Sequence, residues 1–313
     1  MLLRDTTPAW RPADAAVAAD AGTTLTGWAT GGTAAMTAIA SYPNPFNGAA
    51  PSTCEVICQT TIGPCHTTSP ERQDVSDGWD GIPVRLSLRI LDSACQPVSD
   101  AVVEIWHTNY RGIYSGRINA MCNTAEEDRA AQYFRGYLRT DDDGRVDFNT
   151  CFPGWYSSRC VHIHVRIMTG DYNASDNATA EVITQLVFSD ELVQSVFGNE
   201  PLYRDFGQPD TLLANDNVVG GESDRRPYIP DIARMSDGVM LASKTIIIRQ
   251  STAEELCTAQ GGGNMGGGSS GGPPGPPDGG FGPPPESDGG FPPPPGFDAG
   301  SSGADDGGGE DAG

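Results

Sequence analysis

The middle of the chain alternates apolar and polar residues with a period of two, the pattern of half-buried β-strands. In residues 84–90 (VRLSLRI) the apolar side chains fall on one face, and Arg85, Ser87 and Arg89 fall on the other. Further strands are expected at residues 101–108, 134–140, 145–150, 161–168, 182–188 and 244–250. Turn-forming residues recur between these segments, which favours an all-β sandwich or barrel.

The segments between the strands predict one turn, one short helix and two long loops. Residues 141–144 (DDDG) lie between two strand segments and predict a tight hairpin turn. A short helix is expected at residues 189–197, because Ser189 can cap its start, acidic residues follow, and Gly198 can end it. Residues 116–133 and 202–232 are left as long loops.

Composition divides the chain into three parts. Residues 1–52 are poor in large apolar residues, and residues 258–313 are rich in Gly, Pro and Asp. Such segments bury too little apolar surface to offset the entropy of ordering, so both are predicted to be disordered. Residues 53–257 are then one globular domain of ordinary size. No stretch approaches the roughly 18–20 apolar residues of a membrane-spanning helix.

The net charge of the chain disfavours two kinds of partner. Asp and Glu number 41 against 19 Lys and Arg, which gives a net charge of −22. A protein this acidic repels phosphate backbones and anionic lipid surfaces. Nucleic acid and membrane surfaces are therefore poor candidate partners.

The eight cysteines favour disulfides. Cys54, Cys58 and Cys65 lack the C-x2-C spacing of structural zinc sites, so disulfides in an oxidising compartment fit better. The pairing stays open, since eight cysteines can pair in about 105 ways. This predicts an extracytoplasmic protein (periplasmic, secreted or surface-attached). Residues 1–20 show no signal-peptide pattern, so either the natural start lies upstream or export is wrong.

Two of the four histidines, His162 and His164, lie two residues apart on a predicted strand. Alternation places both imidazoles on one face about 7 Å apart, where they can converge on one metal ion. An isolated pair of this kind fits a structural role equally well. With only four histidines in the whole chain, a metal site with three histidine ligands is hard to assemble. Any metal here should therefore take oxygen ligands as well.

Two motifs accompany this pair. Residues 103–116 read VEIWHTNYRGIYSG, and residues 151–164 read CFPGWYSSRCVHIH. In this order and spacing the blocks closely resemble the IW…GxY, PGxY and RxxHxH pattern of the intradiol ring-cleavage dioxygenases, the family of protocatechuate 3,4-dioxygenase and catechol 1,2-dioxygenase. The resemblance runs from about residue 63 to about residue 248. It implies an antiparallel β-sandwich of the intradiol dioxygenase (transthyretin-like) type, with long loops and one short helix.

The resemblance also implies a mononuclear, non-haem Fe(III) site. The positions that match the family's metal ligands are Tyr114, Tyr156, His162 and His164. Arg159 matches the arginine that stabilises the ketonised catecholate, and Gln185 matches a glutamine beside it. Phenolates are hard anionic donors that keep iron in the ferric state.

The implied reaction cleaves a catechol-type ring between its two hydroxylated carbons. O2 supplies both added oxygen atoms, and the product is a cis,cis-muconate type of diacid. Tyr156 would also act as general base for the protons of the substrate. The implied partners are a small aromatic diol and O2, with assembly into a homo-oligomer left open.

Alternative assignments exist for several of these residues. Tyr110 competes with Tyr114 for the ligand position, and Tyr156 could be a turn residue. Arg159 could be a surface residue or the partner of one of the many acidic residues. His107 follows Trp106 directly and points to the opposite face, so it is expected either to support the site from behind the ligands or to be structural. For the remaining candidates, we expect a loop position for His66 and a disulfide for Cys160.

Three departures from the family pattern bear on the substrate. Cys65 stands where the family usually has an aromatic, Val187 stands where another aromatic is frequent, and about six residues are added within 170–180. If the substrate carries a carboxylate, a basic pocket could come from Arg135, Arg139 and Arg166.

The main alternative function is a non-catalytic, exported β-sandwich that serves as a binding or surface module. A superoxide dismutase type of site needs about six histidines, and the chain has four.

Overall fold

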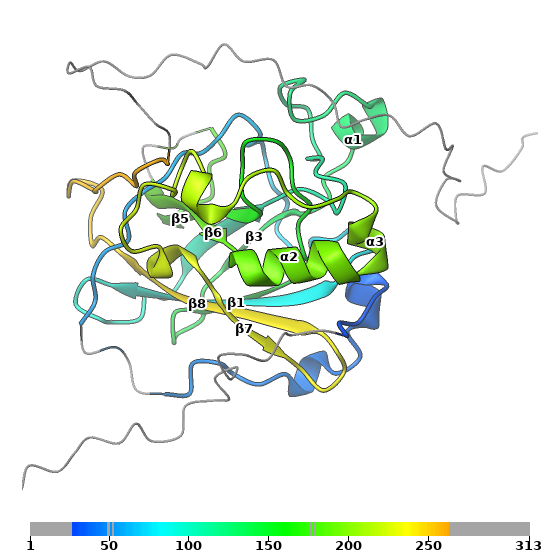
Figure 1. Ribbon diagram of the computed structural model, residues 1–313. Helices are drawn as coiled ribbons and strands as arrows, with labels where there is room; N and C mark the ends of the chain where they lie inside the picture. Colours follow the sequence, from blue (N-terminus) through cyan, green and yellow to red (C-terminus); the bar gives the residue numbers. More distant parts are fainter. Residues whose placement is uncertain (1–26, 49–50, 52, 176, 178–179, 263–313) are drawn as a thin grey trace, which may run out of the picture. The chain divides into compact units, whose positions relative to one another are not determined.

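The computed structural model describes residues 27–48, 51, 53–175, 177 and 180–262. Their strands form two four-stranded sheets (Figure 1). The first sheet has the order β4-β1-β8-β7, with bounds Arg145–Cys151, Pro83–Asp92, Met240–Ile248 and Asp231–Arg234. The second has the order β3-β2-β5-β6, with bounds Arg135–Arg139, Ala101–Trp106, His162–Thr169 and Ala180–Val187. Every predicted strand is present, and β7 was missed.

Strand direction departs from the prediction at one place. β1 and β8 run parallel, with Val84 opposite Met240 and Asp92 opposite Ile248, whereas the other ladders are antiparallel. The prediction of a wholly antiparallel fold is therefore wrong for this pair. A long connection separates the two strands in sequence, so no hairpin turn fixes their relative direction.

The two sheets share one apolar core. Alternate residues of β1, among them Leu86 and Leu88, belong to the same buried cluster as Ile105 of β2 and Ile163 and Val165 of β5. The opposite face of β1 is covered as well, because Arg85 and Ser87 are also buried. Arg85 pairs with Asp147 at 3.0 Å, and Ser87 donates to the same carboxylate at 2.5 Å.

Part of the segment predicted to be disordered packs on the domain. Residues 27–48 include two 3-10 helices, Gly32–Ala35 and Ile39–Ser41. Met36 lies in a small apolar cluster with Met235, Val239 and Leu241, and Arg89 of β1 lies 5.0 Å from the centre of the Phe46 ring. The prediction for residues 1–52 is wrong for this stretch, because a few apolar residues are enough to anchor a thin segment. Residues 1–26 and 263–313 lie outside the described residues.

Residues 141–144 do form a tight turn, but it does not join a hairpin. Gly144 N donates to Asp141 O at 3.0 Å, and Asp141 Oδ1 accepts from Arg145 N at 2.8 Å. The strands on either side, β3 and β4, belong to different sheets. The predicted hairpin is wrong because the same turn chemistry also carries a chain from one sheet to the other.

The predicted helix is confirmed as α2 (Asp190–Asn199), with Ser189 Oγ accepting from Leu192 N at 3.3 Å. It runs one residue beyond Gly198. Two shorter helices, α1 (Glu126–Ala130) and α3 (Pro201–Arg204), were not predicted.

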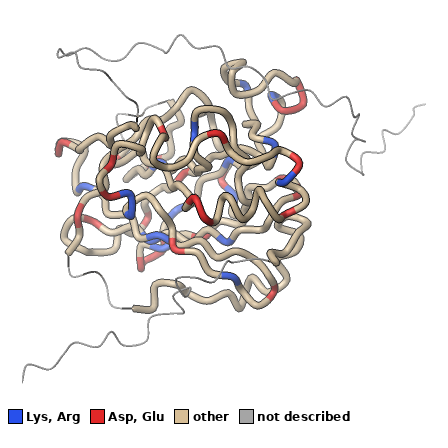
Figure 2. The backbone as a smooth tube through the Cα atoms, in the orientation of Figure 1, with Lys and Arg blue, Asp and Glu red and all other residues tan. Residues whose placement is uncertain are grey.

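None of the described helices is long and apolar enough to cross a membrane. Figure 2 shows acidic and basic positions interspersed along the described chain.

Three disulfides join six of the eight cysteines. The pairs are Cys54–Cys95, Cys58–Cys257 and Cys65–Cys122. Cys151 and Cys160 are buried free thiols, so the expectation of a disulfide at Cys160 is wrong. Cys160 N instead donates to the carboxylate of Asp216 at 3.0 Å, which places this cysteine in a hydrogen-bonded loop.

Candidate metal centre

Four side-chain donor atoms converge at one end of the second sheet. Tyr114 Oη lies 3.2 Å from both His162 Nε2 and His164 Nε2. Tyr156 Oη lies 3.3 Å from His162 Nε2 and 3.5 Å from Tyr114 Oη. The two histidine Nε2 atoms are 3.2 Å apart. The structure thus brings together all four residues that the sequence motifs singled out as candidate ligands.

Strand β5 positions the two histidines. Its antiparallel neighbours place Trp106 of β2 and Gln185 of β6 on either side of His164. The indole of Trp106 stacks on the His164 imidazole, with centroids 4.7 Å apart and an interplanar angle of 7°. The alternation that buries Ile163 and Val165 in the core therefore directs both imidazoles to the opposite face.

Two glycines hold the tyrosine loops together. Gly112 has a φ of 79°, and a Cβ there would collide with the carbonyl oxygen of Trp155. A Cβ on Gly154 would lie 2.5 Å from Asn109 O. The Gly154 amide also donates to Asn109 O at 2.9 Å. The glycines of the GxY and PGxY motifs are thus the points where the backbones that carry Tyr114 and Tyr156 touch.

His162 presents a lone pair to the centre. Its Nδ1 lies 2.7 Å from the carbonyl oxygen of Cys160, and a carbonyl only accepts, so Nδ1 carries the proton and Nε2 is bare. Burial, and then the charge of Arg159, lowers the pKa of His162 from 6.5 to about 3. Burial and the neighbouring His162 lower the pKa of His164 well below its usual range. Both imidazoles are therefore neutral near pH 7, the form that binds metals.

The donor set fits a bound cation. Five close contacts join the four atoms, yet the two phenols and His164 Nε2 supply at most three protons. Separations of 3.2–3.5 Å are those of ligands about 2.0–2.2 Å from a common ion. Burial raises the pKa of the Tyr114 and Tyr156 phenols, so a positive ion is needed to hold them as phenolates. Tyr156 is half-buried, whereas the other three side chains are buried.

Arg159 lies beside this centre, next to Gln185 as the resemblance implies. Its Nη1 donates toward His162 Nε2 at 3.5 Å, and its Nη2 donates to Gln185 Oε1. Gln185 Nε2 in turn donates to the carbonyl oxygen of Thr61 at 3.1 Å. The guanidinium is buried, which excludes the alternative that Arg159 is a surface residue.

Sequence reasoning missed Asp216, which holds Arg159 from the other side. Its Oδ2 accepts from Arg159 Nε at 2.9 Å and from Cys160 N at 3.0 Å, while Oδ1 accepts from Val219 N at 3.0 Å. Burial opposes its ionisation, but the charge of Arg159 and these amides lower its pKa to about 2. Asp216 lies in a loop with no motif, so the sequence carried no signal of this contact.

The competing residues lie elsewhere. Tyr110 packs against Trp79 and Phe206, away from the four donors. His107 is buried, with Nδ1 2.7 Å from Thr108 O and Nε2 2.7 Å from Thr150 Oγ1, which is a structural role as expected.

His66 lies in a loop as expected, whereas the three arginines differ from expectation. His66 Nε2 is 3.2 Å from the buried carboxylate of Glu104, which also binds Arg166 at 2.7 Å. Arg135 donates to main-chain carbonyls, and Arg139 pairs with Asp100 at 3.2 Å. Each arginine is thus bound to its own partners rather than gathered with the others around one space. The basic pocket considered for a substrate carboxylate is therefore not formed by these three residues. The described residues hold no gathering of three or more His, Cys, Asp or Glu that could bind a metal.

Comparison with known proteins agrees with this geometry. Residues 61–199 match the family model described as Dioxygenase; the search of curated proteins gives no match. The intradiol ring-cleavage dioxygenase from Tetranychus urticae shares 24% identity over 63% of this chain and 95% of its own, with a TM-score of 0.51. The dioxygenase domain of a carbohydrate-binding fusion protein from Streptomyces sp. SirexAA-E shares 18% identity over 63% of this chain and 100% of its own, with a TM-score of 0.43.

The matched region contains both tyrosines, both histidines, Arg159 and Gln185. Asp216 lies beyond its end. With the motifs in the expected order and their side chains gathered at one place, residues 61–199 match the Dioxygenase family model and resemble the intradiol ring-cleavage dioxygenases.

Proposed function

We propose that the chain is a ferric dioxygenase that cleaves a catechol-type ring between its two hydroxylated carbons. The observation that carries the proposal is the convergence of two phenol oxygens and two neutral imidazoles within 3.2–3.5 Å of one another. Tyr114, Tyr156, His162 and His164 would hold one Fe(III) ion. When bound, this ion supplies Lewis-acid chemistry to the catechol oxygens and a path for electrons between ring and O2.

The side chains of the protein divide the remaining work. Tyr156 is half-buried and the least buried member of the donor set, so an arriving diol meets its oxygen first, and this oxygen accepts a proton from a substrate hydroxyl. Arg159 points fixed positive charge at the place where negative charge gathers on the ring. Gln185 and Asp216 hold the guanidinium in that orientation through the hydrogen bonds to its Nη2 and Nε.

The same proposal covers fold type and location. The single apolar core between the two sheets supports a β-sandwich. The three disulfides support a location outside the cytoplasm, where such bonds persist. The partners are then a small aromatic diol and O2.

Visible absorption of the purified protein, before and after anaerobic addition of catechol, tests the proposal. Tyrosinate bound to Fe(III) should give a broad red-brown charge-transfer band that moves to longer wavelength when the diol binds. A band without a shift keeps the iron site and rejects simple catechols. A protein that stays colourless after iron reconstitution overturns the proposal and favours the non-catalytic binding module.

A matched pair of tyrosine variants assigns the band. Tyr114→Phe removes one phenol oxygen from the donor set and should abolish or strongly weaken the band. Tyr110→Phe removes a phenol oxygen four residues earlier, on a ring that packs against Trp79 and Phe206, and should leave the band intact. The reverse result would show that Tyr110 is the ligand.

A further inference from the structure

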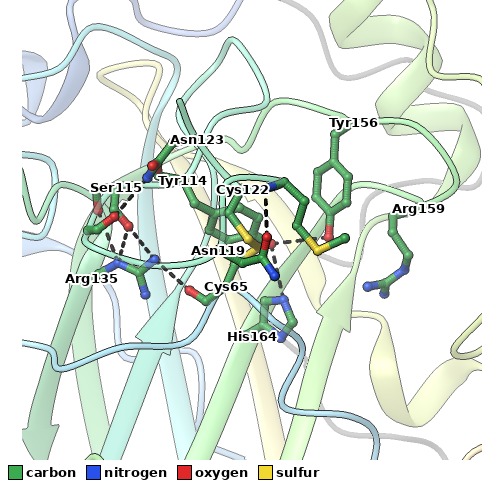
Figure 3. Close-up of a disulfide and its surroundings, with 12 residues drawn as sticks. Cys65, Tyr114, Ser115, Asn119, Cys122, Asn123, Arg135, Tyr156, Arg159 and His164 are labelled. Atoms are coloured by element: carbon green, nitrogen blue, oxygen red, sulfur yellow. Dashed lines mark hydrogen bonds between the residues drawn. A yellow bond between two sulfur atoms is a disulfide. The ribbon is translucent and has the colours of Figure 1, made fainter. Parts of the chain in front are cut away.

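The Cys65–Cys122 disulfide lies directly beside the candidate metal centre (Figure 3). Both half-cystines are buried in one apolar cluster with Trp106 and Tyr114, and Tyr156 packs against this cluster. Cys65 is also the residue that replaces the family's usual aromatic. The covalent bond is therefore a feature of this chain at a position that touches two of the four donor residues.

One end of the disulfide is tied to the backbone of Tyr114. Tyr114 lies in a loop, eight residues beyond the end of β2, so no ladder of strand hydrogen bonds fixes it. Its amide donates to the carbonyl oxygen of Cys122 at 3.2 Å. Asn123 Nδ2 donates to Tyr114 O at 2.7 Å and to Gly116 O at 2.9 Å. The segment that carries Cys122 thus supplies both main-chain contacts of Tyr114.

The other end is tied to the second sheet. Arg135, the first residue of β3, is fully buried and donates to Cys65 O at 2.7 Å and to Ser115 O at 2.6 Å. Its guanidinium also lies 5.9 Å from the centre of the Tyr114 ring. Cys65 is thereby anchored to a strand, and the disulfide carries that anchor to Cys122.

We propose that the Cys65–Cys122 disulfide is a covalent positioning element for Tyr114. With the bond closed, the tyrosine loop is held so that Tyr114 Oη lies within reach of His162 and His164. Two-electron reduction by an added dithiol gives two thiols and the oxidised dithiol, and it frees the Cys122 segment from its anchor. An open loop then has more conformations to lose when it closes on a metal ion, so the site holds iron less tightly. This inference rests on the proposed function only in treating Tyr114 as a ligand.

The test compares two disulfide-free variants of the full chain. Cys65→Ser/Cys122→Ser removes the proposed positioning bond, and Cys54→Ser/Cys95→Ser removes a disulfide outside the apolar cluster around Tyr114. Iron release into an excess of chelator is followed by metal analysis and by the charge-transfer band, with Tm measured in parallel. We expect release to be about 10–100-fold faster in the first variant only. Equal release rates in both variants would overturn the inference.

Amide hydrogen exchange separates this inference from the proposed function. If the wild-type protein takes up no iron, the proposed function fails, but exchange at the Tyr114 amide still measures its positioning. Loss of the bond should speed exchange at Tyr114 and leave the core strand β5 protected; unchanged exchange at Tyr114 contradicts the inference. If the serine variants do not fold, Cys65→Ala/Cys122→Ala and Cys54→Ala/Cys95→Ala, which bury no unpaired hydroxyl, provide the same comparison.

Discussion

At the scale of single residues, the orientation of Arg159 depends on one buried carboxylate that takes no part in the proposed reaction. Asp216 grips Arg159 at Nε, which leaves Nη1 and Nη2 directed at His162 and Gln185. A guanidinium held on one edge keeps its other edge in a fixed direction, because the group is planar. The position of the positive charge over the candidate centre is therefore set from a loop that contributes no ligand.

Asp216→Asn should lower kcat/KM for the cleaved diol by about 10–100-fold, in the range found for residues that orient a metal site. Because the loss comes from a misdirected Arg159, kcat should fall more than KM rises. Oxygen uptake against substrate concentration measures both. Asp224→Asn is the control, because Asp224 pairs with Arg226 at 2.7 Å at the surface and should leave both parameters unchanged.

The lowered pKa of the Asp216 carboxyl also predicts how the free energy of unfolding depends on pH. Its pKa in the folded protein is about 2 against an ordinary value of 3.8, so the folded state favours the ionised form. The stabilisation is fully present above about pH 4 and is lost as the pH falls toward 2. Denaturant unfolding of the wild-type protein should weaken over this window. The Asp216→Asn variant should lose part of that dependence; equal pH profiles for the two proteins would contradict this origin.

The sequence predicted the candidate donors and failed to predict what holds them. The two tyrosines, the two histidines and Arg159 fall in motifs, Gln185 was assigned by the resemblance, and the structure gathers all six. Asp216 lies 57 residues from Arg159 in a loop, and no local pattern of charge or apolar residues marks such a pairing. The partner of Cys65 was equally open, because the number of possible pairings grows much faster than the number of cysteines.

At the scale of elements, the two tyrosine loops must approach each other closely for the donors to meet. Gly154→Ala should separate them, since a Cβ there would lie 2.5 Å from Asn109 O and from Gly112 N. We expect a loss of about 1–3 kcal/mol in the free energy of unfolding together with weaker iron binding. Thermal unfolding and metal analysis measure the two effects.

Gly198→Ala is the matched control for this change. Gly198 lies near the end of α2, and a Cβ there would meet only Gln208 Nε2 at 3.4 Å. Alanine favours a helix over glycine by about 0.5–1 kcal/mol, so this variant should be unchanged or slightly more stable. A Gly154→Ala protein that matches it in Tm and iron content would show that the loop contact is dispensable.

Strands with a clear alternation of apolar and polar residues were predicted well, but the connections between them were not. Alternation identified β1 and β5 because each places apolar residues in a shared core. It could not say that the turn at residues 141–144 joins two sheets, since turn residues specify local geometry and not the partner of the next strand. β7 was missed because four residues are too few to display a period.

At the scale of the whole molecule, residues 27–48 extend the domain beyond the boundary that composition suggested. Composition gives the average apolar content of a segment, whereas the packing of that segment on the domain depends on a few residues. Trp28 and Met36 are buried, and Tyr42 Oη donates to Asp237 at 2.7 Å. These contacts lie near β7 and β8, because Leu241 of β8 belongs to the cluster around Met36 and Ala233 of β7 packs against it. The first sheet is thus covered on its outer side by a segment far from it in sequence.

This covering should contribute measurably to stability. Met36→Ala removes a side chain that packs against Met235, Val239 and Leu241, and it should lower the free energy of unfolding by about 2 kcal/mol, the lower end for a buried Met→Ala change. Ile39→Ala, three residues later at a side chain that is 39% exposed, should change it by less than about 0.5 kcal/mol. Denaturant unfolding of both variants decides the matter. Equal and small losses would show that the segment rests on the sheet without stabilising it, whereas the expected difference makes residues 27–48 part of the cooperative fold that supports the candidate metal centre.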